Sequence, residues 1–407
     1  MTHRIYYTDP SCSSFDATVR SVTIHDGHPA VILDRTAFYP TSGGQPFDTG
    51  RLGPAQVLDV IDFEGPDADI VHVLSAPVRK GDAVRGDIDW VRRFDHMQQH
   101  TGQHVLSAAF DRLFDARTIS FHLGAEIASI DLAKDVTPVQ VSRAETAANE
   151  VVWEDRPVTM RFVSAAEAAT SPLRKEPARG GTLRLIEIPD WDLSACGGTH
   201  VARTGAIGLI AVVAWERFKG GSRLTFVCGG RALGAVRRYR DVVTGSVRQL
   251  SVLPEELPAA IERLQDESKD LRRSLKRVQE ALAVHEGARL VNQVQAVHGR
   301  RVLVVALEGW DANGLKAIAS AATTGDGVVA ALFSTTMPAV AVIARSKDMP
   351  VDAQAVLKEL IARFGGRGGG KPDLAQGGGF SADVATLTAA ARSLIDPQES
   401  DARRVPA

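Results

Sequence analysis

Apolar and polar residues alternate in short runs over the first 90 residues of the chain. The runs fall at residues 19–24, 30–33, 56–63, 69–74 and 83–88, and turn signals such as Asp26-Gly27 and Lys80-Gly81-Asp82 separate them. A period of two with turns of this kind is typical of short β-strands. Closing the strands into a barrel is the simplest arrangement, since closure leaves no unpaired edge. We therefore predict an N-terminal β-barrel domain over residues 1–90.

A helical period follows and then gives way to further strand patterns. Residues 98–110 place Val105, Leu106, Ala109 and Phe110 at helical spacing. An alternating pattern resumes at residues 117–132, a helix is predicted at 142–152, and strands are predicted at 181–188, 205–215 and 222–228. Helices combined with strands in this order predict an α+β domain over residues 91–235.

The period changes again at residues 258–290. Apolar residues recur there at steps of three and four, with mostly charged residues between them: Ile261, Leu264, Leu271, Leu275, Val278 and Leu282. This pattern is typical of a coiled coil of about three heptads. We predict a helical coiled-coil linker over residues 236–295, serving as an antiparallel arm or as the seam of a homodimer.

Apolar strands alternate with helices in the remaining segment. Strand patterns at residues 302–307, 328–333 and 339–344 and helical patterns at 313–322 and 352–364 predict a C-terminal α/β domain over residues 296–407. Its glycine-rich segment, residues 365–379, is expected to be a loop, in which bare amides and the cations Arg367 and Lys371 suit phosphate. The segment lacks the spacing of a nucleotide-binding P-loop. A flexible linker is the alternative.

Composition narrows the class of protein. The 407 residues are 44% hydrophobic and 24% charged, which is ordinary for a soluble protein, and the three cysteines have no regular spacing. We expect a reduced, cytoplasmic protein, since no signal peptide or membrane-spanning run is visible. The net charge of −2 argues against a globally basic nucleic-acid binder. A basic run over residues 217–240 is either a solvated face or a phosphate contact, and Arg217, Lys219 and Arg223 are its candidate phosphate-binding residues.

Four residues have the types and spacing of a metal site. His100 and His104 lie one helical turn apart on the predicted helix, so they share a face. Cys196 and His200 flank two glycines, which allow the loop between them to bend sharply. A Cys/His₃ set of this kind suits zinc, and we predict one Zn²⁺ per chain.

Further candidate residues lie close to this set in sequence. Thr118, Ser120 and His122 are expected to share one face of a strand, either as the wall of a pocket for a small polar substrate or as a half-exposed surface. We group them with Gln103 as candidate catalytic residues. Gln103, and not a glutamate, stands beside the second histidine, so the usual general base of a metallopeptidase is absent and that class is disfavoured.

The segment at residues 37–46 is too rich in glycine and proline to be a strand. It is either a tight surface loop or a loop whose backbone approaches a ligand closely. In the second case Gly43, Gly44 and Gln45 form a substrate-binding loop.

Four motifs, taken in chain order, resemble the editing and C-terminal domains of alanyl-tRNA synthetases. They are Phe38-Tyr39-Pro40-x-x-Gly43-Gly44-Gln45-Pro46, His100-x-x-x-His104, Cys196-Gly-Gly-Thr-His200 and Lys371-Pro-Asp-Leu-Ala-Gln376. No room precedes residue 37 for a class II aminoacylation domain. The chain is therefore similar to the free-standing AlaX editing proteins in their long form. At Thr41-Ser42 it departs from the acidic-glycine pair common in that loop.

This resemblance implies a function and residue roles. The function is hydrolysis of tRNA(Ala) mischarged with serine or glycine, with zinc bound by His100, His104, Cys196 and His200. Thr118 matches the hydroxyl-reading threonine of the family, and the expected partners are tRNA(Ala) and a second copy of the chain. The expected tRNA-binding residues are Arg217, Lys219, Arg223, Arg367 and Lys371. If all four ligands bind at once, the zinc is positional; with three, it keeps an open site. The competing interpretation is a zinc-stabilised tRNA-binding or assembly protein without turnover.

Overall fold

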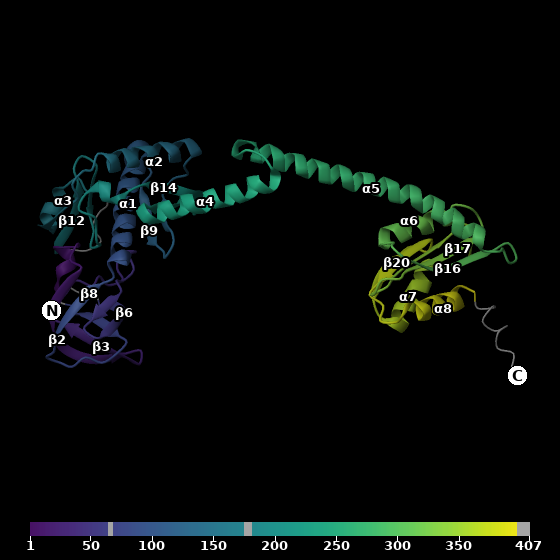
Figure 1. Cartoon of the computed structure of the whole chain (residues 1–407), viewed down its shortest axis with the longest axis horizontal. Coiled ribbons are helices and arrows are strands. Elements are labelled where there is room, and N and C mark those ends of the chain that lie inside the picture. The colour runs from purple at the N-terminus through teal and green to yellow at the C-terminus, as the bar shows by residue number, and fades with distance from the viewer. Residues whose placement is uncertain (64–67, 175–180, 397–407) are drawn as a thin grey trace. The chain divides into compact units, whose positions relative to one another are not determined.

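The computed structural model describes residues 1–63, 68–174 and 181–396 (Figure 1). The chain divides into two compact units, Met1–Gln249 and Leu250–Ala407.

Six strands within the described residues close into the predicted N-terminal barrel, in the order β2-β3-β7-β6-β5-β8. Its core is lined by alternating apolar side chains such as Val19, Leu33, Leu52 and Leu74. The strand β5 was not predicted, because its three residues begin with Gly50 at an expected turn. The strands are β2 (Ser14–His25), β3 (His28–Leu33), β5 (Gly50–Leu52), β6 (Ala55–Asp62), β7 (Ile70–Leu74) and β8 (Ala83–Ile88), and the short β1 (His3–Arg4) pairs with β4 (Arg35–Thr36).

Helix α1 (Trp90–Phe114) begins directly after the barrel. Asp89 caps its first turn by accepting a hydrogen bond from the backbone N–H of Arg92. One turn on, the fully buried guanidinium of Arg93 binds the equally buried carboxylate of Asp48 in the barrel, with Nε 3.1 Å from Oδ1. This buried ion pair fixes α1 to the barrel, and so places a barrel loop beside the middle of the helix.

Two sheets and further helices complete the first unit. One sheet has the order β14-β15-β10-β9 and the other β11-β12-β13. Helices α1 and α2 pack on the apolar face of the first sheet, as expected for an α+β domain. The elements are β9 (Thr118–Leu123), β10 (Ala128–Leu132), α2 (Pro138–Trp153), β11 (Thr159–Ser164), α3 (Ala165–Thr170), β12 (Thr182–Ile188), β13 (Asp192–Ala195), β14 (Ile210–Phe218), β15 (Gly221–Cys228) and α4 (Gly229–Leu250), with 3₁₀ turns at Ile5–Tyr7 and Thr204–Ile207.

A β-bulge in β9 changes which side chains share a face. Thr118 pairs with Leu132 of β10, whereas Ser120 pairs with Asp131, so Ile119 is an extra residue in the ladder. The bulge puts Thr118 on the core face, together with Phe121, and leaves Ser120 on the opposite face. The prediction that Thr118, Ser120 and His122 share one face is therefore wrong.

The second unit contains the predicted α/β domain. Its sheet has the order β16-β17-β18-β20-β19, in which β16 and β17 are parallel and the other pairs antiparallel. Helix α6 and the end of α5 cover one face, and α7 and α8 cover the other. The elements are α5 (Leu257–Gln293), which follows a 3₁₀ turn at Pro254–Glu256, β16 (Arg301–Leu307), α6 (Ala312–Ala322), β17 (Val328–Ser334), β18 (Val340–Arg345), α7 (Ala353–Phe364), β19 (Arg367–Gly370), β20 (Leu374–Gly378) and α8 (Val384–Ile395).

The glycine-rich segment is a β-hairpin, and the prediction of a loop there is wrong. Strands β19 and β20 pair antiparallel across a turn at residues 371–373. A Cβ on Gly368 or Gly370 would lie within 2.5 Å of the backbone of β20, so the close pairing of the two strands requires glycine. Arg367 and Lys371 are both exposed, at the start of the hairpin and at its turn.

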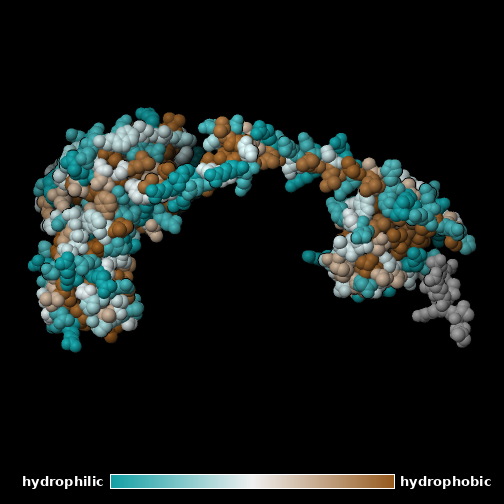
Figure 2. Space-filling model, in the orientation of Figure 1, coloured by the Kyte–Doolittle hydropathy of each residue, from teal (hydrophilic) through white to brown (hydrophobic). Residues whose placement is uncertain are grey.

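Helix α5 is continuous, as the heptad pattern predicts. Between residues 261 and 282 it leaves a stripe of apolar side chains on the surface, from Ile261 at 44% exposed to Leu271 at 71% (Figure 2). A single chain gives this stripe no partner to pack on, so the coiled-coil pairing stays a prediction. In the described part of the chain, no helix combines the length and the apolar character needed to cross a membrane.

Candidate metal centre

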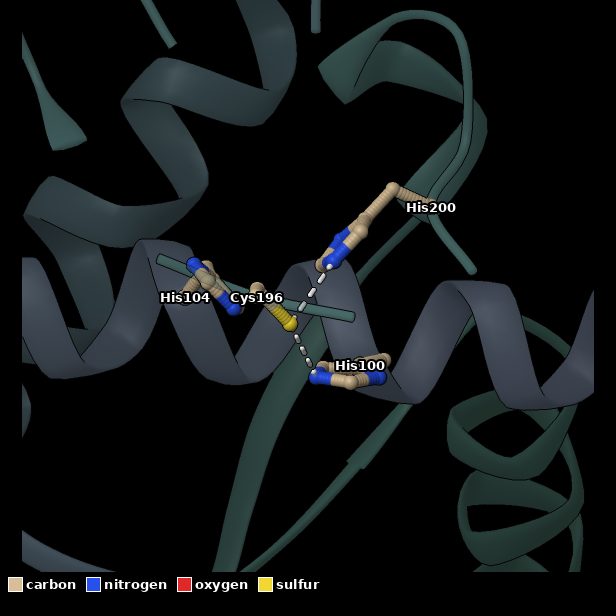
Figure 3. A group of neighbouring side chains, drawn as sticks. All are labelled: His100, His104, Cys196 and His200. Carbon is tan, nitrogen blue, oxygen red and sulfur yellow. Dashed lines mark hydrogen bonds between the residues drawn. The ribbon is translucent and has the colours of Figure 1, made fainter. Parts of the chain in front are cut away.

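Four potential metal ligands meet among the described residues. The ligand atoms of His100, His104, Cys196 and His200 all lie within 4.8 Å of one another (Figure 3). The Sγ atom of Cys196 is 3.3 Å from Nε2 of His100 and 3.4 Å from Nε2 of His200. Nitrogen and sulfur ligands on a tetrahedral zinc ion are about 3.5 Å apart, so these distances fit one shared ion.

Local geometry explains how the two distant motifs come together. Helix α1 presents both histidines on one face, and Cys196 follows directly after β13. A Cβ on Gly198 would lie 2.1 Å from Cε1 of His100, so only glycine lets the loop close over that ring. The two glycines thus allow close approach as well as bending.

The barrel loop holds the outer nitrogen of the first histidine. Oε1 of Gln45, which is completely buried, lies 2.8 Å from Nδ1 of His100. The same side chain donates from Nε2 to Oγ1 of Thr199 at 2.8 Å. Gln45 therefore ties α1 to the loop that carries the other two ligands.

A buried carboxylate holds the second histidine. Nδ1 of His104 lies 2.7 Å from Oδ2 of Asp192. Arg174 donates from Nε to Oδ1 of Asp192 at 2.5 Å, and the hydroxyl of Ser194 donates to the same carboxylate at 3.0 Å. A carboxylate behind a ligand histidine fixes the tautomer and orientation of the ring.

A hydroxyl group holds the third histidine. Oγ1 of Thr101 lies 3.2 Å from Nδ1 of His200 and accepts the backbone N–H of Val201 at 3.1 Å. Each histidine thus has its Nδ1 occupied from behind, which leaves Nε2 to face the common point. This arrangement is the usual one for imidazole ligands and supports the fit to a metal ion.

Electrostatics favour the ligand form of two of these side chains. Burial alone would raise the pKa of the Cys196 thiol, but the imidazoles of His100 and His200 hold it well below its ordinary value. Burial lowers the pKa of His200 to about 3, so this ring is neutral. Burial also acts to lower the pKa of His104, but the hydrogen bond to Asp192 and the Cys196 thiolate raise it to about 9. Metal binding must therefore displace a proton from His104.

Two of the candidate catalytic residues, Thr118 and Gln103, hydrogen-bond to Ser107, which was not among the predicted site residues. The hydroxyl of Thr118 hydrogen-bonds to Oγ of Ser107 at 2.7 Å, and Nε2 of Gln103 donates to the same oxygen at 2.9 Å. Gln103 and Ser107 follow His100 on one face of α1. A polar group next to the ligand cluster therefore includes Thr118 and Gln103.

The other two candidates lie away from this group. The Ser120 hydroxyl donates to Oδ2 of Asp131 at 2.6 Å, on the face of the sheet opposite to α1. Arg223 binds the same carboxylate through two nitrogens, at 2.7 and 2.9 Å. His122 is exposed on that outer face.

The glycine-rich barrel loop meets strand β9. The backbone N–H of Leu123 donates to the carbonyl of Gly44 at 3.1 Å. A Cβ on Gly44, whose φ is +83°, would lie 2.8 Å from the carbonyl oxygen of Phe121. Gly43 also has a positive φ, of +57°. The loop therefore packs on protein through Gly44 and Gln45, and its role toward a substrate stays a prediction.

Acidic residues from elsewhere in the chain lie beside two cations of the basic run. Arg217 is 3.3 Å from Asp135, and Arg223 is bound to Asp131 as described above. Lys219 lies over the ring of Phe218, 5.1 Å from its centroid. Residues 217–223 thus carry less unbalanced charge than the sequence indicates.

Sequence reasoning missed three residues that shape the site. Asp192 lies 88 positions from His104 and has no motif of its own beyond its place four residues before Cys196. Ser107 could have been predicted, because it is the next polar residue on the face of α1 that carries the histidines. Thr101, between the two histidines, was not considered as a site residue.

Three protein-family profiles match the chain. "Threonyl and Alanyl tRNA synthetase second additional domain" matches residues 183–224, the DHHA1 domain matches residues 299–396, and "tRNA synthetases class II (A)" matches residues 12–92. The first of these profiles spans Cys196 and His200.

Relatives match over almost the whole chain. The alanyl-tRNA editing protein AlaX-L of Pyrococcus horikoshii is 30% identical over 93% of this chain and 94% of its own length. The alanine–tRNA ligase of Natronomonas pharaonis is 35% identical over 94% of this chain, which spans 42% of that ligase. Among solved structures, the C-Ala domain of Aquifex aeolicus alanyl-tRNA synthetase matches 25% of this chain and 96% of that domain, with 24% identity and a TM-score of 0.23.

Proposed function

The chain belongs to the family of alanyl-tRNA editing proteins that includes AlaX-L, and we propose that it hydrolyses the ester bond of tRNA(Ala) mischarged with serine or glycine. The observation that carries this proposal is the convergence of His100, His104, Cys196 and His200, each histidine held from behind by a buried polar group. In this reaction water adds to the carbonyl carbon and the bond to the ribose oxygen breaks. The products are a free amino acid and a tRNA with its hydroxyl restored.

The proposed cofactor is one zinc ion held by these four side chains. Bound there, it would supply a Lewis acid that polarises the ester carbonyl or holds the substrate's amino group. The protein's own residues supply orientation. Gln45 and Asp192 fix the two rings of α1, and this positioning suffices for much of the catalysis because an aminoacyl ester is already activated.

Selection of the amino acid is proposed to depend on Thr118. Its hydroxyl, paired with Ser107, lies on the core face of β9 beside the ligand cluster. A seryl side chain differs from an alanyl one by a single hydroxyl. A site that hydrogen-bonds this hydroxyl discriminates strongly against a substrate that lacks it. Gln103 is proposed to hold Ser107 in place rather than to act as a base, since an amide does not accept a proton at neutral pH.

The second unit is proposed to bind the tRNA body. Arg367 and Lys371 are exposed on a hairpin with little side-chain cover, and Lys219 is proposed as a contact from the first unit. The apolar stripe on α5 is proposed to pair with a second copy of the chain.

A deacylation assay with three substrates tests the proposed function. Purified protein is incubated separately with Ser-tRNA(Ala), Gly-tRNA(Ala) and Ala-tRNA(Ala), and the free amino acid is measured. We expect release from the seryl and glycyl esters to exceed release from the alanyl ester. Equal release from all three would indicate a nonselective esterase.

One observation favours a second candidate function. Four ligands drawn this close around Cys196 suit a closed, structural zinc site, which would make the chain a tRNA-binding or assembly protein without turnover. Tight tRNA binding by zinc-loaded protein that releases no amino acid would support this candidate instead.

A further inference from the structure

The ligand cluster opens to solvent on one side. His100, His104 and His200 are buried, whereas Cys196 is partly exposed and the next residue, Gly197, is exposed. A substrate therefore has its shortest approach to the cluster past Cys196 and Gly197. The surface beside these two residues is where the part of the substrate next to the ester must lie.

That surface is the end of the sheet β11-β12-β13. Phe162 on β11 pairs directly with Arg184 on β12, and the backbone N–H of Cys196 donates to the carbonyl of Arg184 at 3.0 Å, extending the ladder beyond β13. Residues directly opposite each other in a sheet point to the same face. Phe162, Arg184 and Cys196 thus form a row, and two strand spacings put Phe162 about 10 Å from the cysteine.

The middle residue of the row is a buried cation. Arg184 is 7% exposed and donates from Nη1 to the carbonyls of Cys196, at 2.9 Å, and Gly198, at 2.8 Å. It donates from Nε to the carbonyl of Tyr7 at 3.0 Å and from Nη2 to the sulfur of Met160 at 3.6 Å. Among the described residues none of these partners is a carboxylate. Its positive charge therefore lies beside the loop of Cys196 and Gly198.

Aromatic side chains flank the cation. Phe162 is 49% exposed on the edge strand β11. The ring of Tyr7 lies 5.7 Å from the Arg184 guanidinium, and a Cβ on Gly197 would lie 3.7 Å from the Tyr7 hydroxyl. Phe162 and Tyr7 are thus both neighbours of Arg184.

We infer that Phe162 is a stacking surface for the terminal base of the tRNA 3′ end. The inference rests on the proposed function, which places the ester at the ligand cluster. One ribose joins that ester to the terminal base, so the base must lie on the surface next to the cluster. An unpaired base stacks on an exposed aromatic ring, and the Arg184 charge attracts the phosphate on the 5′ side of that nucleotide.

A fluorescent base tests this inference without relying on hydrolysis. The probe is tRNA(Ala) that carries a seryl amide, which cannot be hydrolysed, and 2-aminopurine as its terminal base. Stacking on a ring quenches 2-aminopurine fluorescence. We expect quenching with the wild-type chain, loss of most of it in Phe162→Ala, and retention in Phe162→Tyr. For hydrolysis of Ser-tRNA(Ala), KM should rise about 5- to 100-fold in Phe162→Ala.

A matched variant controls for general effects. Trp153, at the end of α2, is 70% exposed and lies outside the row, so Trp153→Ala should keep both the quenching and the KM. Zinc content equal to that of the wild type shows that each variant is folded around the cluster. Equal quenching by Phe162→Ala and wild type, or no quenching by wild type, would overturn the inference.

The outcomes for the two proposals are separable. A chain that quenches the probe through Phe162 but releases no serine would contradict the proposed function and leave the stacking surface in place. A chain that releases serine with an unchanged KM and unchanged quenching in Phe162→Ala would contradict the stacking surface alone.

Discussion

Nδ1 of His104 lies 2.7 Å from Oδ2 of Asp192, a carboxylate that has no exposed surface. Burial acts to raise the pKa of Asp192, but the hydrogen bond from His104 and the charge of Arg174 hold it below its usual range. The carboxylate is therefore ionised behind the ring. An ionised partner at this position makes the imidazole a stronger donor to a metal ion.

Replacing this carboxylate should weaken metal binding without emptying the ligand set. We expect Asp192→Asn to bind zinc about 10- to 100-fold more weakly than the wild type, measured by competition with a chelator. Asp190→Asn is the matched control, because Asp190 is exposed in a turn with φ of +57°, which asparagine also tolerates. Equal zinc affinity in both variants would remove Asp192 from the metal site.

Zinc affinity should rise with pH through the titration of His104. The pKa of this ring is raised to about 9 in the metal-free chain, so below that pH zinc must displace a proton. The apparent affinity should gain about tenfold per pH unit from this one proton between about pH 6 and 9. Asp192→Asn removes one of the two groups that raise the pKa of His104, and its zinc affinity should depend less on pH. An affinity that falls as the pH rises over this range would contradict this assignment.

The sequence predicts those parts of the fold that depend on local periodicity. Alternation over residues 19–88 predicts the barrel, and the heptads after residue 258 predict a long helix. The sequence also predicts the four residues of the ligand cluster. Two histidines one helical turn apart, together with a cysteine and a histidine that flank two glycines, are an unusual combination.

Contacts between distant residues are not predictable in this way. Gln45 reaches His100 across 55 positions, and nothing local to Gln45 indicates this contact. The bulge at Ile119 comes from the pairing of β9 with β10 and reverses the face of every later residue, which a strict period of two misses. The glycine-rich hairpin shows the same limit, since its strands are defined by backbone pairing without side chains.

Thr118→Val should lower the rate of hydrolysis of the seryl substrate more than that of the glycyl substrate. Valine keeps the shape of the side chain and deletes its hydroxyl, which should cost about 1–3 kcal/mol in kcat/KM for Ser-tRNA(Ala) and little for Gly-tRNA(Ala). Ser120→Ala is the control, because the bulge places Ser120 on the outer face with Asp131. Equal losses on both substrates would show that Thr118 shapes the site rather than reads the hydroxyl.

The glycine-rich hairpin should contribute salt-sensitive tRNA affinity. We expect Arg367→Ala/Lys371→Ala to bind tRNA(Ala) more weakly, with a slope of log affinity against log salt that is shallower by about 1.5. Ester hydrolysis at saturating substrate should be unchanged. Lys316→Ala/Lys358→Ala removes two exposed cations from α6 and α7 and should keep the wild-type slope.

The mass of the same hairpin variant separates tRNA binding from self-association. The apolar stripe on α5, which includes Leu271 and Leu275, is the proposed seam between two copies, and the hairpin substitutions do not touch it. Sedimentation should therefore give the variant the wild-type mass. Wild-type affinity and salt slope would exclude the hairpin as a tRNA contact, whatever the mass.

Serine release measured together with zinc content tests the central claim most directly. Wild-type chain should carry one zinc ion and release serine from Ser-tRNA(Ala) faster than alanine from Ala-tRNA(Ala). Cys196→Ala removes the thiolate at the centre of the cluster and should lose much of the zinc and the serine release together. Serine release at the wild-type rate from zinc-free Cys196→Ala, or none from zinc-loaded wild type, would contradict a zinc-dependent editing deacylase.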